Sequence, residues 1–228
     1  MPETRPAVPH PGPDAGPAAG RDADARAGDP SGRAPLGRLL VVTDRRQARH
    51  GLLATLRRAV DGGLRAVLLR EKDLPRGERV RLAAAIRALL APVGGALLVA
   101  SDPTIPADGL HLAANDPSPG PGRRPVPVGR SCHHRQEVVA AREEGCTYVT
   151  LSPVFPSPSK PGHGPALGLG ALGGHPLPVY ALGGVDAEGA AACVDAGAAG
   201  VAVMGAVMRA DRPERVTARL LGALGEPA

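Results

Sequence analysis

Short apolar runs recur along the chain, and polar residues follow most of them directly. These runs predict eight strands, near residues 38–43, 65–70, 96–101, 109–112, 126–129, 147–151, 178–182 and 199–204. Apolar residues at helical spacing predict helices over 51–61, 75–91, 134–144, 186–196 and 212–224, with a helical turn near 166–173. Eight strands with mostly helical connections favour a parallel (β/α)₈ TIM barrel. The alternative, a flavodoxin-like open sheet, would need fewer strands.

The length of the chain agrees with one barrel and a separate tail. Residues 36 to 224 supply about 24 residues per strand–helix unit, which suits a compact barrel. Met1 to Pro35 is built mainly from Pro, Gly, Ala, Arg and Asp, with almost no large apolar side chain to bury. Such a segment cannot offset the entropy of ordering it. We therefore expect a disordered tail over 1–35 and a single barrel domain over 36–228.

Composition and charge exclude several classes of function. The net charge of +5 could suggest a nucleic-acid partner, but the arginines are scattered and the chain has one Phe, two Tyr and no Trp for base stacking. No apolar run approaches the roughly 20 residues that span a bilayer, and no secretory signal is visible. Three cysteines without a CxxC pair fit a reducing compartment. We expect a soluble, cytoplasmic protein with no nucleic acid or membrane partner; a homo-oligomer stays open.

Glycine-containing turns end the last two predicted strands. Gly183 and Gly184 follow one strand, and Met204, Gly205 and Ala206 follow the next. In barrels these two loops often bind phosphate through backbone N–H groups, and glycine lets the backbone approach the anion closely. Two tight strand-to-helix turns are the alternative. Their position in the barrel favours a phosphate site.

Two carboxylates follow the adjacent third and fourth strands. Asp102 and Asp116 offer the oxygen ligands that Mg²⁺ prefers, and Arg70 and Lys72 after the second strand could hold a diphosphate. Either aspartate alone is better explained by the turn that it opens before a proline. The four residues taken together favour a magnesium–diphosphate site. Lys72 and Lys160 are the only lysines of the chain, and both follow predicted strands.

Two further polar groups follow the fifth and sixth strands. His133 could transfer protons near neutral pH, although a residue that starts a helix is the simpler explanation. Ser157, Ser159 and Lys160 share a Pro-rich loop, where two hydroxyls and an ammonium could bind a second phosphate. An ordinary surface loop is the alternative there. Lys160 favours the phosphate hypothesis.

Taken in order, these motifs resemble those of the thiamine phosphate synthase and TenI superfamily of small (β/α)₈ barrels. The resemblance covers residues 38–224 and starts from Val42-Thr43-Asp44 and Arg70-Glu71-Lys72. The synthases join a hydroxymethylpyrimidine diphosphate to a thiazole phosphate and release pyrophosphate. The resemblance implies that Arg70 and Lys72 bind the diphosphate and that Asp102 and Asp116 hold Mg²⁺. It also implies that Ser131 is the active-site serine and that Ser157, Ser159 and Lys160 stand at the Thr-x-Thr-Lys motif. Gly184 and the turn Met204–Ala206 would form the thiazole phosphate site.

Three departures from the synthase pattern keep other functions open. Leu68, Ser101 and Ala114 stand where the synthases have Gln, Asn and Gln, and neither Leu68 nor Ala114 can hydrogen-bond a heteroaromatic ring. Gly129–His133 resembles the Gly-Arg-Ser-x-His motif of TenI thiazole tautomerases, in which His133 would be catalytic. TenI proteins need neither the metal aspartates nor Lys72.

We therefore expect a synthase-type transferase that uses Mg²⁺, with Lys72, Ser131, His133 and Lys160 as its catalytic residues. A thiazole tautomerase without a metal is the alternative. A non-catalytic binder or regulator that recognises thiazole phosphate or thiamine phosphate is a third hypothesis.

Overall fold

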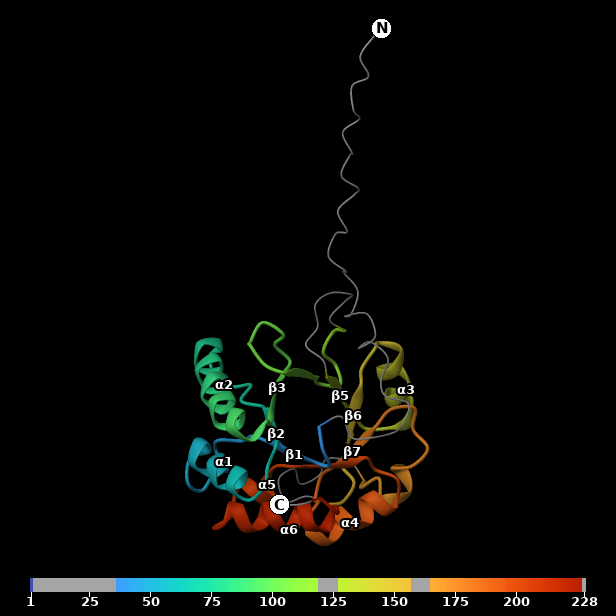
Figure 1. The fold of residues 1–228 in the computed structure, drawn as a ribbon. Coiled ribbons are helices and arrows are strands. Elements are labelled where there is room, and N and C mark those ends of the chain that lie inside the picture. Colours follow the sequence, from blue (N-terminus) through green and yellow to red (C-terminus); the bar gives the residue numbers. More distant parts are fainter. Residues whose placement is uncertain (2–35, 119–126, 157–164, 227–228) are drawn as a thin grey trace.

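A computed structural model describes Met1 and residues 36–118, 127–156 and 165–226 (Figure 1). The tail predicted over 1–35 lies outside these residues, except for Met1. Eight parallel strands form a closed barrel in sequence order, and the first strand pairs with the last, so the predicted fold class is confirmed. The strands are Leu39–Val42 (β1), Ala66–Leu69 (β2), Ala96–Ala100 (β3), Gly109–Leu112 (β4), Val128–Cys132 (β5), Tyr148–Leu151 (β6), Val179–Leu182 (β7) and Gly200–Val203 (β8).

Helices lie around the outside of the barrel (Figure 1). Two of them begin at side-chain caps: Asp186 accepts a hydrogen bond from the Gly189 N–H at 2.9 Å, and the His134 side chain accepts one from the Glu137 N–H. The α-helices are Leu52–Asp61 (α1), Arg76–Leu90 (α2), Arg135–Glu143 (α3), Ala187–Asp195 (α4), Gly205–Met208 (α5) and Pro213–Ala223 (α6), and the 3₁₀ turns are Ala91–Val93 (η2) and Leu169–Ala171 (η3).

The structure corrects the position of the fifth strand. The strand predicted over 126–129 runs instead over Val128–Cys132, where Gly129 pairs with Tyr148 and Ser131 with Thr150 on β6. Arg130 is tolerated inside this strand because its buried guanidinium pairs with Glu144 on the outer side of the barrel. The helical turn predicted near 166–173 shortens to η3, and the short helix α5 was not predicted.

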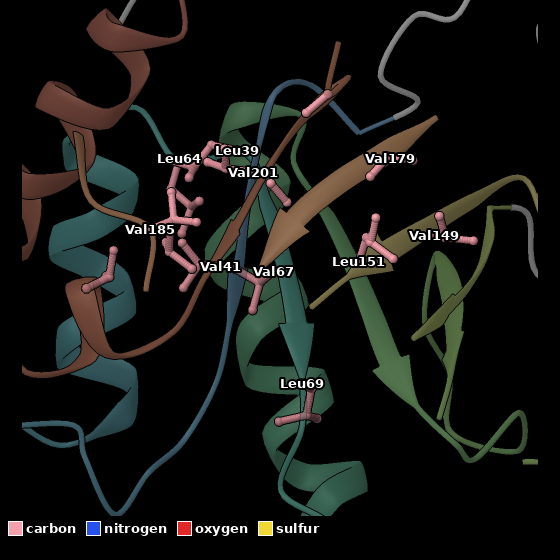
Figure 2. Close-up of a cluster of buried hydrophobic side chains, with 14 of the residues drawn as sticks. Leu39, Val41, Leu64, Val67, Leu69, Val149, Leu151, Val179, Val185 and Val201 are labelled. Atoms are coloured by element: carbon pink, nitrogen blue, oxygen red, sulfur yellow. The ribbon is translucent and has the colours of Figure 1, made fainter. Parts of the chain in front are cut away.

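Alternation along the strands divides the core into two layers. The outer layer lies between barrel and helices, and Figure 2 shows part of it, with Leu39, Val41 and Val67 among its members. The inner layer fills the barrel with small and aliphatic side chains and with Tyr148 and Tyr180. These two rings meet edge to face, 5.5 Å between centroids. Both tyrosines of the chain thus fill the barrel interior.

None of the helices in the described ranges is long and apolar enough to cross a membrane.

Candidate active site at the carboxyl ends of the strands

The predicted diphosphate cations flank a buried carboxylate. Arg70 and Lys72 are exposed after β2, while Glu71 between them is only 2 % exposed. The Glu71 carboxylate accepts hydrogen bonds from the Arg45 backbone N–H at 2.9 Å and from its guanidinium at 3.2 Å. The Arg70 N–H donates to the hydroxyl of Thr43 at 2.9 Å. These bonds tie the β2 loop to the β1 loop and hold two cations at the same edge of the barrel.

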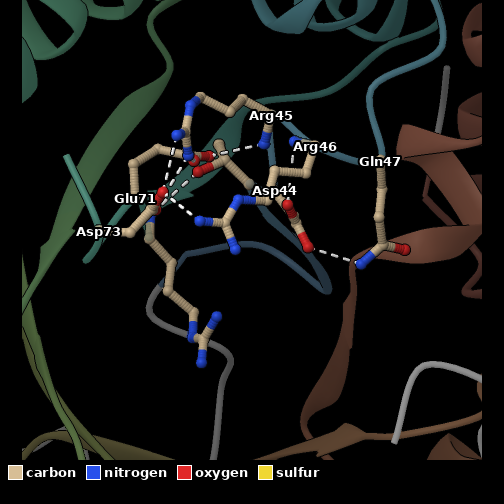
Figure 3. Close-up of polar contacts among 8 residues, drawn as sticks. Asp44, Arg45, Arg46, Gln47, Glu71 and Asp73 are labelled. Carbon is tan, nitrogen blue, oxygen red and sulfur yellow. Dashed lines mark hydrogen bonds and ion pairs between the residues drawn. The ribbon is translucent and has the colours of Figure 1, made fainter.

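A surface ion-pair network extends this connection (Figure 3). The Asp73 carboxylate lies 2.7 Å from the guanidinium of Arg45 and 2.7 Å from that of Arg46. The hydrogen bond from Arg45 lowers the pKa of Asp73. Asp44 accepts from the Arg46 N–H at 3.0 Å and from the Gln47 side chain at 2.6 Å. Most of the polar atoms at the tip of the β1 loop therefore have partners.

Asp102 is strongly bound by its own loop. One carboxylate oxygen accepts from the Thr104 N–H at 3.1 Å and from the Thr104 hydroxyl at 2.6 Å. The other accepts from Arg79 at 3.1 Å. The hydrogen bond from the Thr104 hydroxyl is the main reason that the pKa of Asp102 is lowered. The turn interaction considered as the alternative is thus present, and it leaves one lone-pair position of the carboxylate for another ligand.

Arg130 holds the backbone of the loop that carries Asp116. The Arg130 guanidinium donates to the carbonyls of Ala113, Ala114 and Asp116 at 2.9, 3.0 and 2.9 Å. Burial opposes ionisation of Asp116, but the nearby Ser101 hydroxyl, the hydrogen bond from the Ala113 N–H at 2.7 Å and the charge of Lys72 lower its pKa overall. Because β3 pairs with both β2 and β4, the loops that follow β2 and β4 stand at the same edge of the barrel. Arg130 supports this loop from outside the barrel, a role that sequence reasoning missed.

The oxygen ligands that these aspartates offer fit a magnesium ion whose remaining coordination positions are filled by the substrate and by water. Both carboxylates have lowered pKa values, so both are ionised at neutral pH. Within the described ranges, no group of three or more His, Cys, Asp or Glu residues could form an all-protein metal cage. Mg²⁺ commonly takes one or two carboxylates and fills its other positions with waters and phosphate oxygens.

The glycine turns after β7 and β8 expose backbone donors. Gly184 has φ +67°, and a Cβ there would lie 2.5 Å from the Pro156 carbonyl, so the turn requires glycine. No described residue accepts a hydrogen bond from the N–H groups of Gly184, Gly205 or Ala206. The Arg209 guanidinium folds back against Gly205 and donates to the Gln47 side chain. Sequence reasoning missed Arg209, although its spacing of four residues from Gly205 on α5 places it there.

Two more of the predicted site residues, Ser131 and His133, are on or directly after β5. His133 is exposed, and its Nδ1 lies 2.8 Å from the Ser152 carbonyl, which can only accept. Nδ1 therefore carries a proton, and in the uncharged form of the ring Nε2 holds the lone pair that could act as a base. Ser131 is partly buried, with Oγ 3.0 Å from Nε2 of the buried His111. Ser157, Ser159 and Lys160 lie outside the described residues, and their roles stay predictions.

The fold and the loops at the carboxyl ends of the strands, which form the mouth of the barrel, together define a class of protein. A closed (β/α)₈ barrel brings cations, carboxylates and available backbone amides to the carboxyl ends of its strands, which is the arrangement of a barrel that handles phosphorylated small molecules. Residues 39–207 match the thiamine monophosphate synthase family, and the chain belongs to that family.

Individual relatives agree with this assignment. The chain is 40% identical over 186 residues to a thiamine-phosphate synthase of Methanoculleus marisnigri, covering 75% of this chain and 87% of that protein. It is 36% identical over 204 residues to a thiamine-phosphate synthase of Roseiflexus castenholzii, covering 84% and 88%. The solved thiamine phosphate pyrophosphorylase of Pyrococcus furiosus superposes with a TM-score of 0.73 at 26% identity, covering 82% and 95%.

Proposed function

We propose that this protein is a thiamine-phosphate synthase: a transferase that joins a hydroxymethylpyrimidine diphosphate to a thiazole phosphate and releases pyrophosphate. One observation carries the proposal. Arg70 and Lys72 follow β2, and Asp102 and Asp116 follow the adjacent strands β3 and β4. Exposed cations and ionised carboxylates therefore stand at neighbouring strand ends, and this is the combination that a magnesium-bound diphosphate requires. The names of the family and of its relatives give the product, thiamine phosphate, and the two substrates are those that the motif resemblance implies.

The residues of the β2, β3 and β4 loops act on the diphosphate. Arg70 binds it through its planar guanidinium and Lys72 through a point charge, so both stabilise the leaving group while positive charge grows on the pyrimidine methylene. Asp102 and Asp116 hold Mg²⁺, which supplies further charge neutralisation when bound. Glu71 and Arg130 act indirectly: they fix the β2 and β4 loops on which these groups stand.

The thiazole phosphate occupies the glycine turns after β7 and β8. The N–H groups of Gly184, Gly205 and Ala206 donate to its oxygens, and Met204 and Gly183 shape the two turns. Arg209 adds a cation beside Gly205. Ser157, Ser159 and Lys160 are proposed to complete this site from the β6 loop, with Lys160 as a catalytic cation.

A coupling assay tests the proposed function. Full-length protein is incubated with both substrates and Mg²⁺, and thiamine phosphate and pyrophosphate are measured together. We expect equal amounts of the two products and a severe loss in Lys72→Ala, because the leaving group loses a cation. Arg57→Ala, which removes an exposed cation of α1, is the matched control and should leave turnover unchanged. No product from the wild-type protein, or equal turnover with Lys72→Ala, would contradict the proposal.

His133 supports thiazole tautomerisation as a second candidate. Its Nε2 is available as a base at the mouth, and proton shuttling by such a group contributes roughly 10²–10⁴ in rate. His133→Ala should abolish tautomerisation and affect coupling far less, whereas Lys72→Ala should do the reverse. A protein that binds thiamine phosphate tightly and turns over neither substrate would instead be a binder or regulator.

The setting of the reaction follows from the same proposal. Cys132, Cys146 and Cys193 are buried thiols, which suits the reducing cytoplasm that we propose as its location. A homo-oligomer stays a prediction, to be checked by the mass of the protein in solution.

A further inference from the structure

A line of polar side chains runs up the inside of the barrel to Ser131. The Tyr148 hydroxyl lies 2.9 Å from His111 Nδ1, and His111 Nε2 lies 3.0 Å from Ser131 Oγ. Thr150 Oγ1 is more distant from the same Nε2, at 3.5 Å. Tyr148 is completely buried and His111 is 5 % exposed, so water cannot easily replace these partners. The line joins the middle of the core to the mouth.

The geometry of this line depends on a glycine. His111 on β4 pairs with Gly129 on β5, and Gly129 pairs with Tyr148 on β6. A Cβ on Gly129 would lie only 2.1 Å from Cζ of the Tyr148 ring, which is too close for any side chain. Because Gly129 has no side chain, the ring can cross over β5 and bring its hydroxyl to the imidazole on β4. Ser131 is two residues further along β5, on the same inner face and closer to the mouth.

The direction of each hydrogen bond follows from the proton count. Burial raises the pKa of Tyr148 well above its usual range, so the phenol keeps its proton, and His111 Nδ1 is its partner among the described residues. Nδ1 must then accept. Burial also keeps the imidazole neutral, and a neutral imidazole that accepts at Nδ1 carries its proton on Nε2. Nε2–H therefore donates to Ser131 Oγ.

We propose that Tyr148 is a positioning residue that fixes the Nε2-protonated tautomer of His111 and thereby makes Ser131 a hydrogen-bond donor to the bound substrate. With its oxygen already accepting from His111, the Ser131 hydroxyl presents its own proton to an acceptor atom of the ligand. A histidine next to a serine at a strand end resembles a base and its nucleophile. The tautomer excludes that role, because Nε2 already holds a proton. The proposal rests on the proposed function, since it assigns Ser131 a substrate contact.

The tautomer can be read directly from ligand-free protein. In protein labelled with ¹⁵N in its histidine rings, long-range ¹H–¹⁵N correlation spectra distinguish the two neutral tautomers. We expect His111 to be neutral and protonated at Nε2 from pH 6 to 8, and Tyr148→Phe to give a mixture of tautomers. Tyr180→Phe is the matched control, because it removes the hydroxyl of the neighbouring interior tyrosine, which donates to Gly37 instead. A wild-type imidazole protonated at Nδ1, or charged at pH 7, would overturn the proposal.

A double-mutant cycle separates positioning from packing. Thiamine phosphate is the probe, and its affinity is measured by calorimetry for wild type, Tyr148→Phe, Ser131→Ala and the double variant. Loss of one hydrogen bond should weaken binding on the order of 3- to 10-fold in each single variant. If Tyr148 acts through Ser131, the double variant should bind as Ser131→Ala does.

Two results would contradict the substrate contact. Additive losses would show that Tyr148 only supports the core, and an unchanged affinity in Ser131→Ala would show that Ser131 donates nothing to the ligand. Failure of the proposed synthase is recognised separately. A wild type that binds thiamine phosphate but forms none refutes the coupling activity, while the cycle and the spectra still decide the role of Tyr148.

Discussion

The two aspartates proposed to hold the metal differ in the number of hydrogen bonds that their carboxylates already accept from the protein. Asp102 accepts three hydrogen bonds, from Thr104 and Arg79, whereas Asp116 accepts one with good geometry, from the Ala113 N–H. A carboxylate offers about four lone-pair positions. Asp116 therefore has more capacity for a cation, and Asp102 acts partly as the organiser of its own turn. Residue types alone could not predict this division, because it depends on which arginines reach each loop.

The first prediction follows from this difference. Pyrophosphate should bind the wild-type protein in a Mg²⁺-dependent manner, and Asp116→Asn should weaken that binding at least about tenfold, since it removes a charged ligand but keeps a side chain of the same size. Asp102→Ala should weaken it as well. Calorimetric titration with and without Mg²⁺ measures both effects. Asp195→Asn on the exposed end of α4 is the control, and equal wild-type affinity with and without Mg²⁺ would refute the metal site.

The second prediction concerns the pH dependence contributed by His111. Burial, with a smaller effect from Lys72, lowers its pKa to about 3, whereas an unfolded histidine titrates near 6.5. Between these values the unfolded chain binds a proton that the folded chain does not, so stability rises with pH through this window. Acidification from pH 7 to pH 5 should therefore cost about 2 kcal/mol from this residue alone.

Urea unfolding at the two pH values measures the effect. His111→Asn should flatten the difference between pH 7 and pH 5, while His50→Asn, which changes an exposed histidine, should retain it. An equal pH dependence in wild type and His111→Asn would show that the imidazole is already protonated in the folded state.

At the scale of elements, the apolar runs predicted the strands well because the outer and inner layers both need apolar side chains. β5 is the exception, since Arg130 and Ser131 interrupt its apolar pattern. Their polar atoms find partners in Glu144 and His111, which are distant in sequence. The interior line from Tyr148 was likewise hidden, because it depends on the missing side chain of Gly129. The sequence alone predicts which polar residues follow each strand. It does not predict which of these residues contact one another in the folded barrel.

The third prediction concerns the first residue of α5. Gly205 has no positive φ, so alanine fits its backbone, but a Cβ there would displace the guanidinium of Arg209. Gly205→Ala should weaken binding of the thiazole phosphate several-fold and leave the melting temperature unchanged or slightly higher. Calorimetry and thermal unfolding measure the two effects. Gly222→Ala on α6 is the matched control, because a Cβ there meets nothing within 4 Å. Unchanged phosphate affinity would remove Arg209 from the site.

At the scale of the whole molecule, the barrel has two differently built ends. The carboxyl ends of the strands carry the charged loops of the mouth. The opposite end is closed by the segment that precedes β1. The Tyr180 hydroxyl donates to the Gly37 carbonyl at 2.7 Å and accepts from the Leu36 N–H at 3.2 Å, and Leu36 is buried against the inner layer. The barrel described from residue 36 onward is therefore closed at this end by its own first residues.

The last prediction uses this closure to ask where the folded domain begins. Deletion of residues 2–34 should leave the melting temperature nearly unchanged, because that segment offers little apolar surface to bury. Deletion of residues 2–37 removes three residues more, including Leu36 and the partners of the Tyr180 hydroxyl, and should lower the melting temperature by several degrees. Differential scanning calorimetry of both truncations, with the full-length chain as reference, makes the comparison. A fall of several degrees already in the shorter deletion would show that the tail packs on the barrel, and equal stability of the two truncations would show that Leu36 and Gly37 do not close it.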